Sequence, residues 1–112
     1  VIKTGGENVA SIEVERCLLA HPEVLEAAVV GAPHERWGEA ITAVVIGKPG
    51  SAGDEAEALE HCRSRLARFK VPKRILFTDA LPRTGTGKIQ KHVLRTELAG
   101  LYPHGNRESS DV

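Results

Sequence analysis

Residues 24–46 read VLEAAVVGAPHERWGEAITAVVI, two apolar runs separated by a polar stretch that contains glycine and proline. The first run, 24–30, and the second, 40–46, are rich in β-branched and small apolar residues, a composition typical of strands. The residues between them, 31–38, include Pro33 and predict a turn. The sequence therefore predicts two strands that follow each other along the chain.

The segment 11–20, just before these strands, predicts a helix that ends at Pro22. Its apolar residues fall on two nearly opposite sides, one with Val14, Cys17 and Leu18 and the other with Ile12 and Leu19. A helix that is apolar on two sides is expected to be covered on both, here by the sheet and by a neighbouring element.

Residues 55–67 carry the clearest helix signals. Asp54 is a favourable N-cap residue, and Glu57, three positions later, suits a capping box. Further along, residues 74–78 alternate like a strand, and residues 91–101 predict a third helix. The order helix, strand, strand, helix, strand, helix predicts a small α+β fold, and 112 residues suit one domain with a modest core.

Charge is unevenly distributed along the chain, although the 15 basic and 15 acidic residues balance overall. Residues 1–62 hold 4 Lys/Arg and 11 Asp/Glu, whereas residues 63–112 hold 11 and 4. The overall balance gives no reason to expect nucleic acid or a membrane surface as partner. The basic half suits a polyanionic ligand, and the alternative is a solvated surface that aids solubility.

Cysteine and histidine usage predicts no metal site. Cys17 and Cys62 lie among apolar helix positions and are expected to be small buried residues in a reducing compartment. The five histidines lack zinc-ligand spacing. Because there is no signal-peptide pattern and no apolar run long enough for a transmembrane segment, we expect a cytoplasmic protein.

The run PRTGTGKIQK, residues 82–91, places one lysine at the end of a loop of glycines and threonines. Glycine allows unusual backbone angles and leaves room for a ligand, and Lys88 could reach a phosphate or carboxylate as a compact charge. The run is not a P-loop, because Pro82 and Ile89 stand where that motif needs glycine and Ser/Thr. Taken alone, it could also be a solvated turn.

Four segments together resemble the C-terminal domain of the adenylate-forming enzymes, which include acyl-CoA synthetases, peptide-synthetase adenylation domains and luciferases. In order along the chain they are residues 5–15, 33–39, 69–73 and 82–91. Four matches in the right order are far more specific than one. The amino-acid sequences of residues 11–15 and 37–39 are most similar to those of fatty-acid (short- or medium-chain acyl) CoA ligases.

The resemblance implies a compact mixed sheet with about three packed helices. It also implies that residues 1–101 are the mobile C-terminal domain of a larger enzyme, a fragment that is inactive without its own N-terminal domain. Residues 102–112 are polar and contain Pro, Gly and Ser, so we expect a disordered tail there.

The implied activity is that of an acid–thiol ligase with two half-reactions. A fatty acid or other carboxylate attacks the α-phosphate of ATP to give an acyl-adenylate and pyrophosphate, and the thiol of CoA then displaces AMP. ATP and CoA are the substrates, and Mg²⁺ would accompany ATP, held mainly by the absent N-terminal domain. The small domain rotates between the two steps.

The resemblance also implies which residues act. Lys88 is the implied catalytic residue, and it would contact ATP together with Thr86 and Gly87. The implied CoA-binding residues, which include a glycine wall for the pantetheine arm, are Gly5, Gly6, Glu7, Trp37, Arg63, Val71, Pro72 and Lys73.

Two alternatives remain open. A fatty acyl-AMP ligase or an adenylation domain would use the same Lys88 but load a carrier protein in place of CoA. A non-catalytic nucleotide-binding module would share the fold, and replacement of Lys88 would then change no catalytic step.

Overall fold

The computed structural model describes residues 1–102 of the chain. Within them lie a hairpin of short strands, two long strands, one further strand, three α-helices and one 3₁₀ turn. In chain order these are β1 (Ile2–Thr4), β2 (Glu7–Val9), α1 (Ser11–Leu19), β3 (Val24–His34), β4 (Gly38–Gly47), α2 (Glu55–Arg63), η1 (Arg68–Lys70), β5 (Arg74–Thr78) and α3 (Lys91–Glu97).

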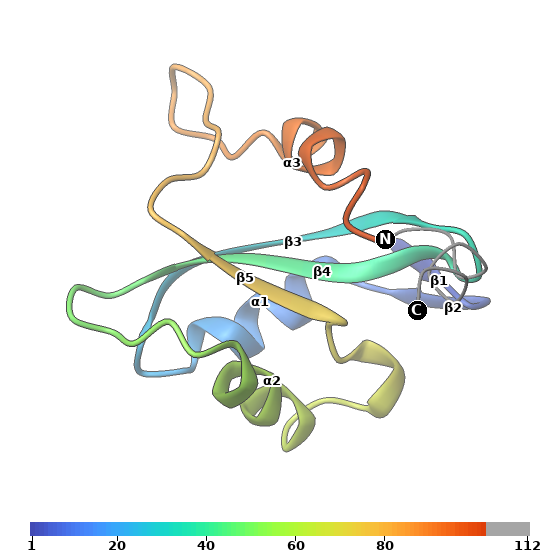
Figure 1. Cartoon of the computed structure of the whole chain (residues 1–112), viewed down its shortest axis with the longest axis horizontal. Helices are drawn as coiled ribbons and strands as arrows, with labels where there is room; N and C mark the ends of the chain where they lie inside the picture. Colours follow the sequence, from blue (N-terminus) through green and yellow to red (C-terminus); the bar gives the residue numbers. More distant parts are fainter. Residues whose placement is uncertain (103–112) are drawn as a thin grey trace, which may run out of the picture.

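The sheet is mixed. β3 and β4 pair antiparallel over almost their full length, and β4 and β5 run parallel with Thr42 opposite Arg74. β1 joins the sheet through Thr4 opposite Gly38. Helices α1 and α2 cover one face of the sheet, and α3 lies on the other (Figure 1). This arrangement confirms the predicted α+β fold with a small mixed sheet and three packed helices.

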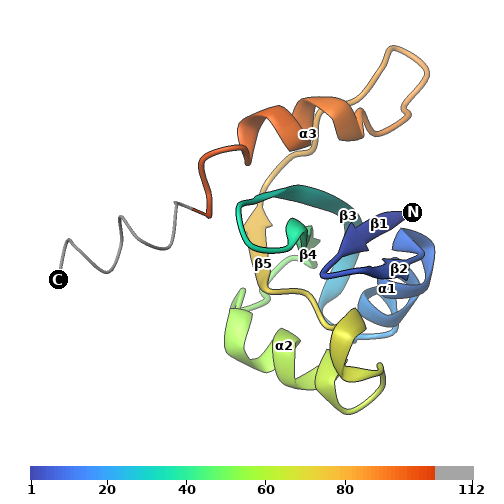
Figure 2. The same ribbon diagram turned by 90° about the vertical axis from the view of Figure 1, so that its right-hand side faces the viewer.

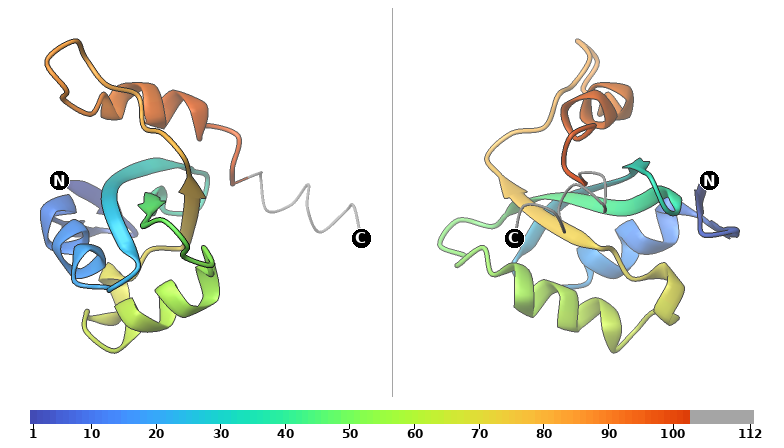
Figure 3. Two further views of the ribbon diagram at one scale, coloured as in Figure 1. Left: turned by 90° about the vertical axis from the view of Figure 1, so that its left-hand side faces the viewer. Right: turned by 45° about the vertical axis from the view of Figure 1, so that its right-hand side comes forward.

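Each face of the sheet has its own hydrophobic cluster. The first lies under α1 and α2 and contains Val14, Leu18 and Val29; the second lies under α3 and contains Ala28 and Leu94. Neighbouring residues of β3 can serve opposite clusters because successive side chains of a strand point to opposite faces. Figure 2 and the left panel of Figure 3 show the resulting three layers from the two ends, and the right panel of Figure 3 shows them obliquely.

The loop between the long strands is shorter than the sequence suggested. The predicted turn over 31–38 is wrong, because β3 continues through Pro33 to His34, which lies opposite Gly38. Proline is tolerated there because β3 is an edge strand, where one missing N–H costs no ladder bond. The remaining turn, 35–37, is closed by Nδ1 of His34, which accepts from the backbone N–H groups of Arg36 and Trp37 at 3.1 and 3.2 Å.

The β1–β2 hairpin has no counterpart among the predicted elements. Each strand has three residues, too few for an alternating pattern to stand out. Gly5 and Gly6 connect them with φ values of +57° and +87°. Two successive positive φ angles are characteristic of the type I′ turn that joins tightly paired strands, and glycine adopts them without strain.

Helix α1 is covered on one side only. Val14 and Leu18 are buried against the sheet, whereas Ile12 and Leu19 on the opposite side are 54% and 48% exposed. The expectation that both sides are covered is therefore wrong for the part of the chain that the structure describes. A helix lying on a sheet meets it along one stripe, and α2 packs beside α1 near Cys17.

Both later helices end earlier than predicted. α2 ends at Arg63 and α3 at Glu97, each followed by tighter turns. Leu66 packs on the first cluster and Leu101 on the second, although both residues lie beyond the ends of the helices. The apolar periodicity therefore predicted their packing correctly but not their secondary structure. Tyr102, the first residue of the predicted tail, bonds through its hydroxyl to Thr42 at 2.9 Å; the rest of that tail lies outside the described residues.

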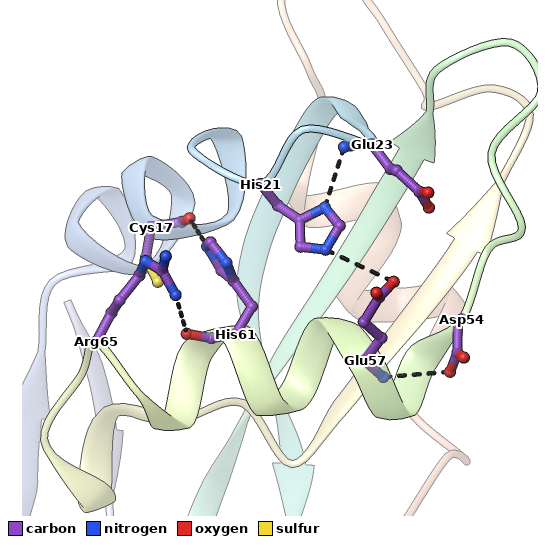
Figure 4. Close-up of polar contacts among 7 residues, drawn as sticks. All are labelled: Cys17, His21, Glu23, Asp54, Glu57, His61 and Arg65. Atoms are coloured by element: carbon purple, nitrogen blue, oxygen red, sulfur yellow. Dashed lines mark hydrogen bonds and ion pairs between the residues drawn. The ribbon is translucent and has the colours of Figure 1, made fainter.

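The contact between α1 and α2 contains several polar groups (Figure 4). Nε2 of His61 donates to the carbonyl oxygen of Cys17 at 2.7 Å, which satisfies one of the last carbonyls of α1. Asp54 is the N-cap of α2 as predicted, since its Oδ1 accepts from the backbone N–H of Glu57 at 3.2 Å. The carboxylate of Glu57 lies toward His21, with Oε1 3.8 Å from Nε2.

The two cysteines are free thiols that lie close to each other across the same contact. Cys62 is buried and Cys17 half-buried. Burial raises the pKa of both thiols, that of Cys62 to about 12. Both are therefore protonated at neutral pH, in agreement with their predicted role as small core residues.

An ion pair joins the start of α2 to β5. Nε of Arg74 donates to Oε2 of Glu55 at 2.7 Å, and the backbone N–H of Ile75 donates to the same oxygen at 3.0 Å. The hydrogen bond from Arg74 holds the pKa of Glu55 below its ordinary value. Folding therefore favours the ionised carboxylate, and the resulting stability depends on pH.

We expect Glu55→Gln to lower the free energy of unfolding at pH 7 by about 1 kcal/mol or less, because solvent screens this partly exposed pair. The contribution of Glu55 is complete above its unfolded pKa of about 4.3 and is lost as the pH falls through the lower folded pKa. Urea unfolding at neutral and acidic pH measures it. Glu60→Gln, which affects an exposed ion pair on α2, is the control. A difference from the unmodified chain that stays constant down to the acidic end would contradict this linkage.

Candidate functional site

The lysine loop between β5 and α3 is a small, internally bonded hairpin. Arg83 and Ile89 form an antiparallel bridge. Inside it, the backbone N–H of Thr84 donates to the carbonyl oxygen of Lys88 at 2.8 Å, and that of Gly87 donates to the carbonyl oxygen of Thr84 at 2.9 Å. Gly87 has φ +92°, where other residues are strained. The backbone that carries Lys88 is thus ordered by local bonds.

The threonine hydroxyls complete this ordering. Oγ1 of Thr84 accepts from the backbone N–H of Lys88 at 3.1 Å and lies 3.0 Å from Oγ1 of Thr86. Residues 83–88 are all exposed, and the loop projects away from the sheet beyond the start of α3 (Figures 1 and 2). A lysine with a fixed backbone and an exposed side chain is suited to enter a site formed by another domain.

A second feature is a pocket of about 450 Å³ between the end of α2 and the segment that leads into β5. It is lined by Leu59, Arg63, Leu66, Arg68, Val71, Pro72 and Lys73. Four of the residues predicted to bind CoA therefore line one cavity. Arg68 was not among the predicted residues, and the cluster of basic residues that begins at Arg63 was the signal that could have indicated it.

The pocket is connected to the two glycine-containing turns through Trp37. Nζ of Lys73 lies 4.3 Å from the centroid of the indole ring, and the ring of His34 stacks on the indole at 4.0 Å between centroids. The backbone N–H of Gly5 donates to the carbonyl oxygen of Trp37 at 3.0 Å. The pocket, the turn after β3 and the β1–β2 turn are therefore neighbours, and the indole is already engaged by Lys73 and His34.

The basic residues of this region differ in what they contact. Nζ of Lys70 lies 3.0 Å from Glu13 on α1, and Nη1 of Arg63 lies 3.3 Å from Glu60 in an exposed pair. Arg68 and Lys73 line the pocket with Arg63. Three cations beside an apolar wall form a cavity suited to a ligand with negative groups and a flat apolar part.

The lysine loop and the β1–β2 hairpin lie at different ends of the domain. In Figure 1 the loop is at the upper left and the hairpin at the right. The structure thus gathers predicted CoA residues around the pocket and the adjoining turns, and it places Lys88, Thr86 and Gly87 elsewhere. Among residues 1–102 no three His, Cys, Asp or Glu side chains are grouped to hold a metal ion. In the same residues, no helix is both long and apolar enough to cross a bilayer.

A family model described as the AMP-binding enzyme C-terminal domain matches residues 13–88, more than half of the chain. The chain belongs to this family. This AMP-binding enzyme C-terminal domain is 47% identical over 112 residues to the peroxisomal trans-cinnamate:CoA ligase of Petunia hybrida. It is 42% identical over 103 residues to the long-chain-fatty-acid–CoA ligase FadD13 of Mycobacterium tuberculosis.

Solved structures of similar enzymes resemble this domain in fold as well as in sequence. ATP-bound MatB from Rhodopseudomonas palustris superposes with a TM-score of 0.88 at 44% identity and covers 91% of this chain. A fatty acyl CoA synthetase of M. tuberculosis superposes with a TM-score of 0.84 at 43% identity. The match to the Petunia ligase includes 97% of this chain, and the match to FadD13 includes 92% of it. The chain spans only about 20% of the length of those two relatives and of MatB.

Proposed function

We propose that the chain is the mobile C-terminal domain of an AMP-forming acyl-CoA ligase that acts on a fatty acid or a related carboxylate. The observation that carries the proposal is the pairing of two separate features on one domain. One is an exposed, internally ordered lysine loop, and the other is a basic pocket beside a glycine turn. Formation of the acyl-adenylate would use the lysine loop, and formation of the thioester would use the basic pocket and the glycine turn.

Lys88 would act in the first half-reaction. A carboxylate that attacks the α-phosphate of ATP brings two negative groups together, and a preorganised cation lowers the free energy of that approach. Gly87 leaves room for the nucleotide beside the lysine, and Thr86 offers a hydroxyl. As the family resemblance implies, Mg²⁺ accompanying ATP would be held mainly by the N-terminal domain of the enzyme.

The pocket would hold the nucleotide end of CoA in the second half-reaction. Its volume lies within the range of roughly 300–1,000 Å³ that small-molecule sites occupy. Arg63, Arg68 and Lys73 would meet the phosphates, while Val71 and Pro72 offer an apolar surface to the adenine. The pantetheine arm would pass the neighbouring turn of Gly5 and Gly6, beside Glu7, and Trp37 would hold Lys73 in place through its indole.

This assignment predicts a selective effect of Lys73. In the full-length enzyme, we expect Lys73→Gln to raise KM for CoA about five- to tenfold by removing one charged hydrogen bond to a phosphate. ATP–pyrophosphate exchange should stay unchanged. Lys70→Gln is the matched control, since Lys70 lies three residues away but pairs with Glu13. Equal effects of the two variants on KM would contradict the assignment of the pocket.

The nature of the acceptor is tested in the same assay. Thioester formation with CoA is compared with formation on a carrier protein that bears a phosphopantetheine arm, with a panel of fatty and aromatic carboxylates. We expect CoA to be the acceptor. Transfer to the carrier alone would overturn the ligase proposal in favour of a carrier-loading enzyme, while retaining the role of Lys88.

A further inference from the structure

Two ion pairs flank the exposed lysine loop, one at each end. At its start, the guanidinium of Arg83 pairs with Glu26 on β3 and also donates through Nη1 to the carbonyl oxygen of Gly87 at 3.2 Å. One side chain thereby ties the first arm of the loop to the sheet and braces the turn inside the loop. Glu26 points to the same face of β3 as Ala28, the face that α3 covers.

At the other end, Lys91 is the first residue of α3. Its Nζ lies 2.7 Å from Oε2 of Glu15 and 3.3 Å from Oγ of Ser11, both on α1. The same carboxylate oxygen accepts from the backbone N–H of Val29 on β3 at 2.9 Å. Glu15 is well shielded, with 17% of its side chain exposed, so its charge is screened less than that of a surface residue.

One end of the loop is thus tied by an ion pair to Glu26 on β3, and the other end is tied to Glu15 on α1. The carboxylate of Glu15 is itself bonded to the backbone of Val29 on β3. Residues 83–88 are exposed and lie outside both hydrophobic clusters, whereas Ile89, just before Lys91, packs against the α3 cluster. The local hydrogen bonds of the loop set its internal shape but not its direction relative to the sheet. Leu81 and Ile89 anchor the two arms of the loop on the α3 cluster, and the ion pairs add to that packing in setting the direction, because charge-assisted hydrogen bonds are stronger than neutral ones.

We propose that the pairs Arg83–Glu26 and Lys91–Glu15 are positioning elements that aim the lysine loop. Their structural role stands by itself, whereas their effect on adenylation rests on the proposed function. Arg83 and Lys91 act through the loop backbone, and Lys88 alone would contact the reacting groups. Loss of either tie leaves Lys88 present but less often in the productive orientation.

The first test measures amide hydrogen exchange by NMR in the 112-residue chain, close to neutral pH. Glu15→Gln and Glu26→Gln remove the charge and keep the size, and the glutamine at 15 can still accept from Val29. We expect the Gly87 and Lys88 amides to exchange about five- to tenfold faster in each variant, relative to amides of β4. The double variant should show roughly the product of the two factors.

Glu13→Gln is the matched control, because Glu13 lies on the same helix and pairs with Lys70, far along the chain from the lysine loop. In the Glu13→Gln variant, the amides of Gly87 and Lys88 should exchange at the same rates as in the unmodified chain. Unchanged loop exchange in the Glu15 and Glu26 variants would overturn the proposal. An equal rise in loop and β4 amides would also overturn it, because that pattern reports general destabilisation.

The second test separates this inference from the proposed function. In the full-length enzyme, we expect Glu15→Gln and Glu26→Gln to slow ATP–pyrophosphate exchange about tenfold, while thioester formation from a pre-made acyl-adenylate is unchanged. Glu26→Asp, which keeps the charge, should restore part of the rate. If Lys88→Ala abolishes exchange and the glutamine variants do not affect it, the positioning role fails and the proposed function stands. If Lys88→Ala has no effect, the proposed function fails, and hydrogen exchange still decides whether the ties aim the loop.

Discussion

Replacement of Lys88 by alanine is expected to slow ATP–pyrophosphate exchange by about 10²- to 10³-fold, which corresponds to about 2.7–4 kcal/mol of transition-state stabilisation. The physical reason is that the loop holds this cation in advance through the bonds of Thr84 and Gly87. No solvent rearrangement is then needed when the carboxylate meets the α-phosphate. Alanine removes the charge and leaves the hairpin intact, because the bonds made by residue 88 come from its backbone.

The measurement compares the two half-reactions in the full-length enzyme. Thioester formation from a pre-made acyl-adenylate should proceed at nearly the normal rate in the Lys88 variant. Lys48→Ala is the control, since Lys48 is an exposed lysine in the loop after β4. Exchange that survives in Lys88→Ala would contradict the catalytic role and favour a non-catalytic nucleotide-binding module.

Replacement of Gly6 by leucine is expected to have the opposite selectivity. Thioester formation should fall about tenfold or more, while ATP–pyrophosphate exchange is retained. A Cβ at Gly6 would meet no atom within 4 Å in the domain, so the new side chain would extend outward from the β1–β2 turn. The proposal places the pantetheine arm there, and a leucine would narrow its path.

Backbone strain has to be separated from obstruction, because Gly6 has φ +87°. Gly50 is a suitable control, since it has φ +84°, also has open space where a Cβ would be, and lies in the loop after β4. Gly50→Leu introduces the same kind of strain away from the proposed CoA path. Equal losses in both variants, or a loss of both half-reactions in Gly6→Leu, would contradict the role of Gly6 as a channel wall.

Local sequence signals predicted the elements that depend on local preferences. The β-branched runs of 24–30 and 40–46 are strands, residues 74–78 form a strand with the predicted bounds, and Asp54 caps α2. The sequence patterns did not predict the secondary structure correctly where a strand was very short or where one residue suited two structures. Strands of three residues are too brief to show alternation, and Pro33 indicated a turn although an edge strand tolerates it.

The candidate site divides in the same way. The sequence by itself determined the chemistry on offer: a Gly/Thr loop ending in Lys88, a glycine pair at a turn, and a basic second half of the chain. Only the tertiary structure decided which of these residues share a surface. It placed Arg68 beside Arg63 and Lys73 in one pocket and left one side of α1 open.

The two ties of the lysine loop show the physical reason. Glu26 and Arg83 are 57 residues apart, and Ser11 and Lys91 are 80 residues apart, so no local pattern relates them. Backbone preference and hydrophobic periodicity act over a few neighbouring residues and are written in the sequence. The partners of an individual charged side chain are selected only when β3, α1 and α3 pack together, and that selection belongs to the fold.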